Sequence, residues 1–125
     1  MTRARKALLE QLKAQSEPVS ATALAKILPH DQATIYRNLH YLEEQGYAQS
    51  FILHCSEHGT ERYYSYHRLQ DGVHHHWFHC EQCHRFTDLG DCEHLMQLKT
   101  WEDEHGFVIH DHTFFLTGIC ALCKA

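Results

Sequence analysis

Apolar residues recur every three or four positions in three stretches of the first third of the chain, residues 4–15, 21–28 and 32–45. This spacing places them on one face of a helix. The three apolar stripes consist of Ala4, Leu8 and Leu12, of Leu24, Ile27 and Leu28, and of Ile35, Leu39 and Leu42. Ser20 and Asp31 stand at N-cap positions before the second and third stretches. The pattern therefore predicts three short helices.

Two β-rich stretches follow, residues 48–55 and 60–67, on either side of a short polar segment that ends in glycine. Such a pair predicts a β-hairpin. Three helices followed by a hairpin is the order of a winged helix-turn-helix, whose third helix enters the major groove of DNA.

The third predicted helix has a polar face opposite its apolar stripe. That face carries Arg37, His40 and Tyr41, and Thr34 and Tyr36 lie at its edges. A solvated surface would explain the face equally well by itself. The winged-helix order of the elements favours contact with DNA.

The chain divides into two parts near residue 70. Residues 67–72 are mostly polar and end in glycine, and we interpret them as a hinge between a winged-helix DNA-binding domain (1–66) and a dimerisation and metal-binding domain (73–125). Charge divides the chain similarly, with six Lys/Arg against five Asp/Glu in residues 1–47 and five against eleven in residues 48–125. We expect the acidic part to face away from DNA, because attraction to phosphates depends on basic groups.

Two Cys-x-x-Cys pairs lie 36 residues apart in the second part, Cys80 with Cys83 and Cys120 with Cys123. Each pair can present two thiolates from a tight turn, and two pairs complete the tetrahedral shell that structural zinc prefers. A thioredoxin-like dithiol is the weaker alternative, since no βαβ pattern surrounds either pair. We therefore predict a structural zinc ion, which can contribute ~10–16 kcal/mol to folding.

Between the two pairs, the pattern predicts a short strand over residues 84–89, a helix from Asp91 to Gly106 and a long strand over residues 107–120. The apolar face of the long strand would suit pairing with a second copy of the chain. The predicted fold class is α+β, a winged helix-turn-helix domain followed by a small α/β dimerisation domain with a four-cysteine zinc site.

Histidine is unusually frequent, with 14 copies in 125 residues, and four of them fall in the stretch HHHWFH at 74–79. In a strand, His74 and His76 would project from one side at ligand spacing, and His112 could supply a third ligand. Such a set suits exchangeable zinc or iron(II) better than a closed four-thiolate shell does. We therefore predict a separate regulatory metal site, with zinc favoured.

Several of these motifs resemble the ferric uptake regulator superfamily. The segment ATIYRNL at 33–39 is similar to its recognition helix, and HHH…CEQC, EHGF at 104–107 and HDHTFFLTGICALC at 110–123 are similar to its dimerisation domain. The resemblance implies a cytoplasmic homodimeric repressor that controls metal-ion homeostasis and binds an AT-rich palindromic DNA operator when loaded with metal. It also implies structural zinc on the four cysteines.

The resemblance assigns DNA contacts to four residues. Tyr36 would contact a thymine methyl group and Arg37 a phosphate or a guanine, with Thr34 beside them. Arg5 would contact the DNA backbone.

The resemblance also assigns regulatory ligands. His74, His76 and His112 match one family site, whose helix Glu is replaced here by Leu95. The fourth ligand would be Glu93, with Asp91 and His94 as alternatives.

A second family site, which joins the two domains, matches only at Asp88. Pro18, Tyr64 or Tyr66, and Trp77 stand where the other ligands are usual. Such a site would have to be rebuilt from the remaining candidates, which are His54, Cys55, His58, His67, His75 and Cys92.

Two other function classes are consistent with the abundance of histidine and cysteine. A metal-storage or chaperone module would not need the ATIYR motif, and a zinc hydrolase would need a base motif that is not evident, so we expect a protein that is not an enzyme. The sequence has no apolar run long enough to span a membrane and no signal-like segment near Met1, so we expect no membrane partner.

Overall fold

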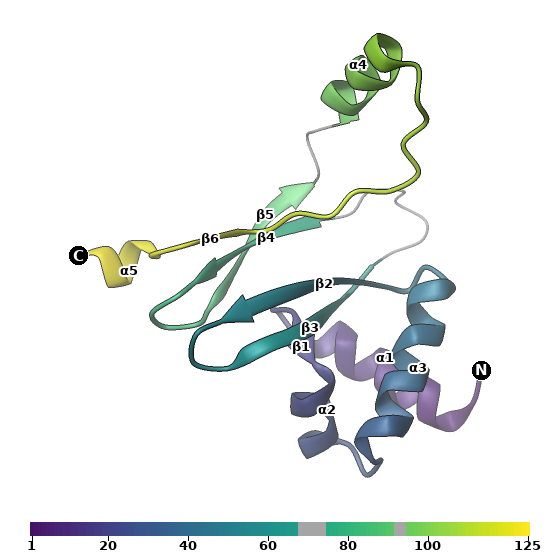
Figure 1. Ribbon diagram of the computed structural model, residues 1–125. Coiled ribbons are helices and arrows are strands. Elements are labelled where there is room, and N and C mark those ends of the chain that lie inside the picture. The colour runs from purple at the N-terminus through teal and green to yellow at the C-terminus, as the bar shows by residue number, and fades with distance from the viewer. Residues whose placement is uncertain (68–74, 92–94) are drawn as a thin grey trace. The chain divides into compact units, whose positions relative to one another are not determined.

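The structure is a computed structural model that describes residues 1–67, 75–91 and 95–125, without the side chains of Asp91 and Leu95. The chain forms two compact units, Met1–Gly72 and Val73–Ala125 (Figure 1). Most of the predicted hinge lies outside the described residues. Among the described helices, none combines the length and the apolar character that crossing a bilayer requires.

Within its described residues, 1–67, the amino-terminal unit contains three helices and three strands. In chain order they are α1 (Arg3–Ala14), β1 (Val19–Ser20), α2 (Ala21–Ile27), α3 (Gln32–Glu44), β2 (Ala48–Cys55) and β3 (Gly59–Tyr66). The strands form an antiparallel sheet in the order β1-β3-β2. Figure 1 shows the helices gathered beside the β2–β3 hairpin, which is the wing. The predicted winged helix-turn-helix is confirmed.

Side-chain caps fix where these helices begin. Ser20 Oγ accepts a hydrogen bond from Ala23 N (3.1 Å), and an Asp31 carboxylate oxygen accepts one from Thr34 N (2.8 Å). Each cap satisfies a backbone donor that has no partner within its helix. Both caps stand where the sequence predicts them.

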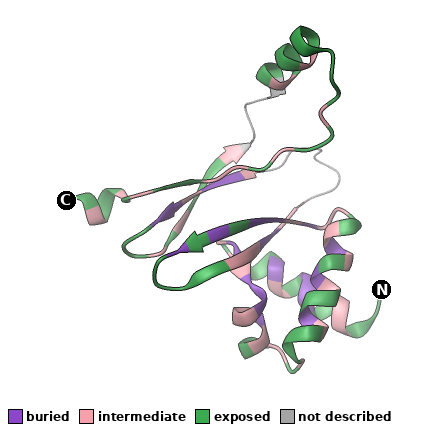
Figure 2. Cartoon of the chain, in the orientation of Figure 1, coloured by how far each residue is buried: buried purple, intermediate pink, exposed green. Residues whose placement is uncertain are grey.

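The predicted stripes supply most of the core of this unit, but Ile27, the last residue of α2, is 55% exposed, so the second stripe contributes Leu24 and, in part, Leu28. Six leucine and isoleucine side chains from the three helices are exposed by 1% or less, and these are Leu8, Leu12, Leu24, Ile35, Leu39 and Leu42. Ala48 and Tyr64 close the core from the sheet. Figure 2 shows this burial along the inner sides of the helices.

The carboxy-terminal unit has a second three-stranded sheet. Its elements are β4 (His75–Cys80), β5 (Phe86–Asp91), α4 (Leu95–His105), β6 (Leu116–Gly118) and α5 (Ala121–Lys124). The sheet order is β5-β4-β6, with β4 antiparallel to β5 and parallel to β6. The register of β4 against β5 shifts between His75 and Trp77.

Two boundaries differ from the predictions. Asp91 ends β5, opposite His75, and does not open the helix, which is described from Leu95. The long strand over residues 107–120 shrinks to Leu116–Gly118, because only this segment finds a backbone partner within the described chain, at Phe78–Cys80. Alternation alone does not make a strand, since each strand needs a neighbour to hydrogen-bond.

Candidate metal centre and nucleic-acid interface

The four predicted zinc ligands come together in the carboxy-terminal unit. The sulfur atoms of Cys80, Cys83, Cys120 and Cys123 all lie within 4.8 Å of one another. Cys83 Sγ and Cys120 Sγ are 3.8 Å apart. A zinc ion with bonds of 2.3 Å to sulfur holds tetrahedral thiolates about 3.8 Å apart, so the cluster can hold this ion.

Two chain turns position these cysteines. Cys80 ends β4, a turn over residues 81–83 brings Cys83 back beside it, and His84 follows in the left-handed region at φ 65°. The second pair belongs to α5, with Cys120 at its N-cap. The turn and the helix start direct backbone N–H groups at the Cys80 sulfur, from Cys83 (3.5 Å) and Cys120 (3.4 Å).

The thiols of this cluster have unequal acidities. The two backbone N–H donors lower the pKa of Cys80 to about 6. The hydrogen bond with Cys120 raises the pKa of Cys123 to about 12. Thiols packed this closely cannot all ionise without a cation, whereas a divalent ion stabilises all four thiolates at once.

Two of the predicted regulatory ligands also meet. His76, which is buried, and His112 have their Nε2 atoms 3.2 Å apart. His76 Nδ1 lies 3.1 Å from the carbonyl oxygen of Phe114, to which it can donate, and this leaves the lone pair of the neutral ring on Nε2. A tetrahedral zinc ion holds two nitrogen ligands about 3.3 Å apart, so the pair fits one ion. The other ligands proposed with them, His74, Glu93 and His94, lie outside the described residues.

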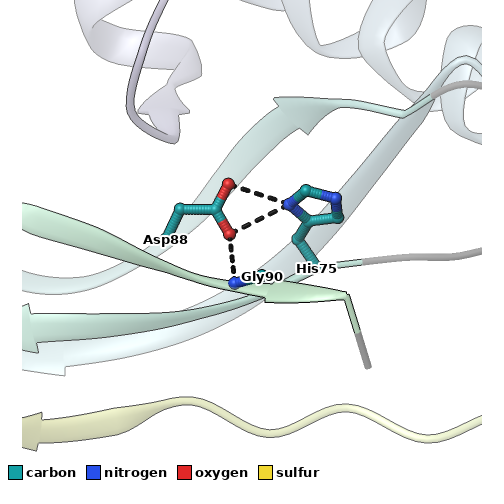
Figure 3. Close-up of polar contacts among 3 residues, drawn as sticks. All are labelled: His75, Asp88 and Gly90. Carbon is teal, nitrogen blue, oxygen red and sulfur yellow. Dashed lines mark hydrogen bonds and ion pairs between the residues drawn. The ribbon is translucent and has the colours of Figure 1, made fainter. Parts of the chain in front are cut away.

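A second histidine of β4 pairs with a carboxylate (Figure 3). His75 Nδ1 lies 2.9 and 2.8 Å from the two carboxylate oxygens of Asp88, and Gly90 N donates to the same carboxylate at 2.8 Å. A carboxylate that accepts the Nδ1 proton directs Nε2 outward as a basic nitrogen, an arrangement common among metal-binding histidines. Trp77, two residues along, is buried and offers no ligand.

Of the remaining candidate ligands for a second metal site, some lie within the described residues and some lie outside them. His54 Nδ1 lies 2.7 Å from Thr60 Oγ1, and Cys55 Sγ lies 3.6 Å from His58 Nδ1. Cys92 is outside the described residues.

The outer face of α3 presents the predicted DNA-contacting side chains. Tyr36 is 37% exposed and Arg37 is exposed, while Arg37 Nη2 donates to Thr34 Oγ1 at 3.2 Å. The start of the helix is fixed by Asp31, whose pKa is lowered by its hydrogen bonds with Thr34. The helix therefore holds these side chains on a rigid element that faces solvent.

Arg5 is held by α3 and does not extend freely. Its Nε donates to Asn38 Oδ1 at 3.1 Å, and its guanidinium lies 3.6 Å above the ring of Tyr41. The sequence pattern places Tyr41 on the polar face of this helix but does not single out Asn38. The spacing of these two residues, three apart on one helix, was the available signal, because residues three apart share a face.

A polar network also ties the wing to α3. Arg62 Nη1 donates to Ser50 Oγ at 2.9 Å, and Ser50 Oγ in turn donates to Glu43 Oε2. The hairpin and the helix therefore share one hydrogen-bonded connection in addition to their apolar contacts.

Comparisons with known proteins agree with this architecture. The sequence model of the Ferric uptake regulator family matches residues 1–117. A ferric uptake regulation protein of Neisseria meningitidis is 32% identical over 93 residues, which is 74% of this chain and 60% of that protein. The match thus spans less than two thirds of the relative's length.

Solved structures show the same fold. The ferric uptake regulator of Helicobacter pylori, described as having three functional metal binding sites, gives a TM-score of 0.71 at 17% identity, over 100% of this chain and 82% of the other. A zinc uptake regulator complexed with zinc and DNA gives 0.71 at 23% identity, over 98% and 82%. With the family match over most of its length, the chain belongs to the ferric uptake regulator family.

Proposed function

We propose that the protein is a metal-dependent, DNA-binding transcriptional regulator, and not an enzyme, that acts as a homodimer in the cytoplasm. The observation that carries the proposal is the pair of Nε2 atoms of His76 and His112, 3.2 Å apart in the unit that follows a winged helix. Family membership supports it, as does a related fold that has been solved with zinc and DNA.

The proposed structural ion is zinc on the four cysteines. An all-thiolate shell is closed and holds zinc tightly, which suits a permanent role. The proposed regulatory ion sits on His74, His76, His112 and Glu93, with Asp91 or His94 as alternatives to Glu93. Zinc is favoured over iron(II) because imidazole ligands predominate.

The proposed DNA target is an AT-rich palindrome, read by one α3 from each copy of the chain. Tyr36 would contact thymine methyl groups, and Arg37 would contact phosphate or guanine, with Thr34 beside it. Arg5, held against Tyr41, would contact the DNA backbone. Residues Phe107 and Val108, 49% and 72% exposed, offer apolar surface for the second copy.

The test is DNA binding by the wild-type protein and by a His76→Ala, His112→Ala double variant, with and without added zinc or iron(II). We expect zinc to strengthen binding by the wild type about 5–150-fold and to have no effect on the double variant. His110→Ala is the matched control, an exposed histidine on the same segment. A metal response that persists in the double variant, with the fold intact, would place the sensor elsewhere.

A further inference from the structure

The turn of the wing carries two metal-ligating side chains that the sites above do not use. Cys55 ends β2, and His58 immediately precedes β3. Cys55 Sγ and His58 Nδ1 are 3.6 Å apart. Zinc bonds of 2.3 Å to sulfur and 2.0–2.1 Å to nitrogen place two such ligands about 3.6 Å apart on a tetrahedral ion. The two atoms therefore have the spacing of ligands that share one ion.

The backbone explains why this pair is brought together. Cys55 lies opposite Gly59 in the β2–β3 ladder, so the loop between them has three residues. Gly59 has a φ of 78°, in the left-handed region. A three-residue loop closed by a left-handed residue is a common hairpin connection. The hairpin itself thus holds the thiol beside the imidazole, and an ion would not have to order them.

The same arrangement of a strand end, a ligand three residues later and a left-handed residue occurs at the first pair of the four-cysteine cluster. Cys80 ends a strand, Cys83 stands three residues on, and His84 follows in the left-handed region at φ 65°. In the wing, the corresponding residues are Cys55, His58 and Gly59. Each turn is a Cys-x-x-ligand hairpin, and the two belong to separate units of the chain. The wing turn therefore has the local geometry of a metal knuckle.

We propose that Cys55 and His58 form an exchangeable metal site in the wing, for zinc or another divalent ion of borderline softness. The Cys55 thiol loses its proton to solvent when its sulfur bonds to the ion, and the neutral His58 ring binds through Nδ1. Water or further ligands complete the tetrahedral shell. Two protein ligands bind more weakly than four thiolates, so the four-cysteine cluster fills first.

Because the four-cysteine cluster binds its ion first, Co²⁺ added to zinc-loaded protein can report on the wing site. Protein carrying one zinc ion per chain is titrated with Co²⁺ in a Cys92→Ser background, which removes the sixth cysteine. We expect a thiolate-to-cobalt charge-transfer band in the near ultraviolet. An ion bound at His76 and His112 has no sulfur ligand there and does not contribute to this band.

Three variants distinguish the site from other sources of the band. Cys55→Ser should abolish the band, and His58→Gln should weaken Co²⁺ binding about 10-fold or more. His54→Gln is the matched control, because His54 neighbours Cys55 on the strand but contacts Thr60 across the hairpin. It should leave both the band and the affinity unchanged.

Several outcomes would overturn the proposal. One is the absence of the band from the Cys92→Ser protein, and another is a band that survives when Cys55→Ser is added to it. A band accompanied by release of the bound zinc into a chromophoric chelator would place Co²⁺ on the four-cysteine cluster instead. If Cys55→Ser fails to fold, the His58→Gln variant provides the test, because His58 is exposed. An unchanged Co²⁺ affinity in this variant contradicts a wing site.

Discussion

Removing zinc from the four-cysteine cluster should unfold the carboxy-terminal unit and leave the amino-terminal unit folded. Among the described residues of the carboxy-terminal unit, the buried ones are His76, Trp77, His79 and Cys80. Trp77 is the only large apolar side chain in this set. Burying the 150–250 Å² of a tryptophan at about 25 cal/mol per Å² contributes about 4–6 kcal/mol.

The proposed zinc ion would be the larger contribution to the stability of this unit. A structural zinc ion adds ~10–16 kcal/mol, well above the apolar burial just described. The amino-terminal unit does not depend on the ion, because six aliphatic side chains of its helices are almost fully buried. At about 1.5–3 kcal/mol each, they contribute roughly 9–18 kcal/mol. Chelation should therefore unfold the carboxy-terminal unit and leave the amino-terminal unit folded.

The sequence provides a separate optical probe for each unit. Both tryptophans, Trp77 and Trp101, lie in the carboxy-terminal unit, and all six tyrosines lie in the amino-terminal unit, between Tyr36 and Tyr66. On treatment with a strong chelator, tryptophan emission should shift to the red as Trp77 becomes exposed. The tyrosine signal in near-ultraviolet circular dichroism should persist.

Two variants check this reasoning. Cys80→Ser should reproduce the chelated state, because it removes one thiolate from the centre of the cluster. Cys55→Ser, a substitution of the same kind in the other unit, should leave tryptophan emission unchanged. Complete loss of zinc with no change in tryptophan emission would refute the dependence of this unit on the ion.

Three further predictions concern the recognition helix, the helical core and the acidity of the cluster. Tyr36→Ala should reduce the preference for operator over scrambled DNA by about 1–3 kcal/mol while zinc content is unchanged, and equal discrimination in gel-shift titrations would contradict the groove assignment. Leu39→Ala leaves a cavity in a fully buried site and should lower the free energy of unfolding of the amino-terminal unit by about 2–5 kcal/mol, measured by the tyrosine signal during denaturation. Zinc uptake by metal-free protein should accelerate only as pH approaches the ordinary thiol pKa near 9.0, because the fold that lowers the pKa of Cys80 to about 6 is lost with the ion and only the thiolate binds zinc. Stopped-flow uptake that already accelerates near pH 6 would show that the metal-free unit keeps its fold.

The amino-terminal unit could be predicted from the sequence because its signals are local. Helical spacing of apolar residues and the caps at Ser20 and Asp31 are set by residues a few positions apart, and the structure places the helices accordingly. The positions of Arg5 and Asn38 could not be derived this way. The two residues are 33 positions apart in the chain, and the spacing of Asn38 and Tyr41 shows only that they share a face of α3, not that Arg5 of α1 lies against it.

The carboxy-terminal unit was harder to predict because its signals are not local. Alternation over residues 107–120 favours a strand, but pairing depends on a distant partner, and only Leu116–Gly118 has one in the described chain. The register of β4 against β5 also shifts between His75 and Trp77, which the sequence pattern does not show. His76 and Trp77, which are neighbours in sequence, are both buried, so burial does not alternate along this strand. Cysteine spacing succeeded because each Cys-x-x-Cys turn is itself local.

The metal ligands belong to two chemical classes, thiolates in the four-cysteine cluster and imidazoles at His76 and His112. This separation bears on how the protein could respond to metal without unfolding. If the four-cysteine cluster were the sensor, loss of its ion would remove the main stabilisation of the unit, and the response would be a folding transition. A sensor needs an ion whose departure leaves the fold in place. His76 meets this requirement, because the backbone carbonyl of Phe114 contacts its Nδ1 and leaves Nε2 as the atom that would bind the ion. An ion there can shift DNA affinity only by the difference in its own affinity between the free and the DNA-bound protein. A coupling of ~1–3 kcal/mol is enough for regulation and is small beside the contribution of the structural ion, so both ions can serve one chain.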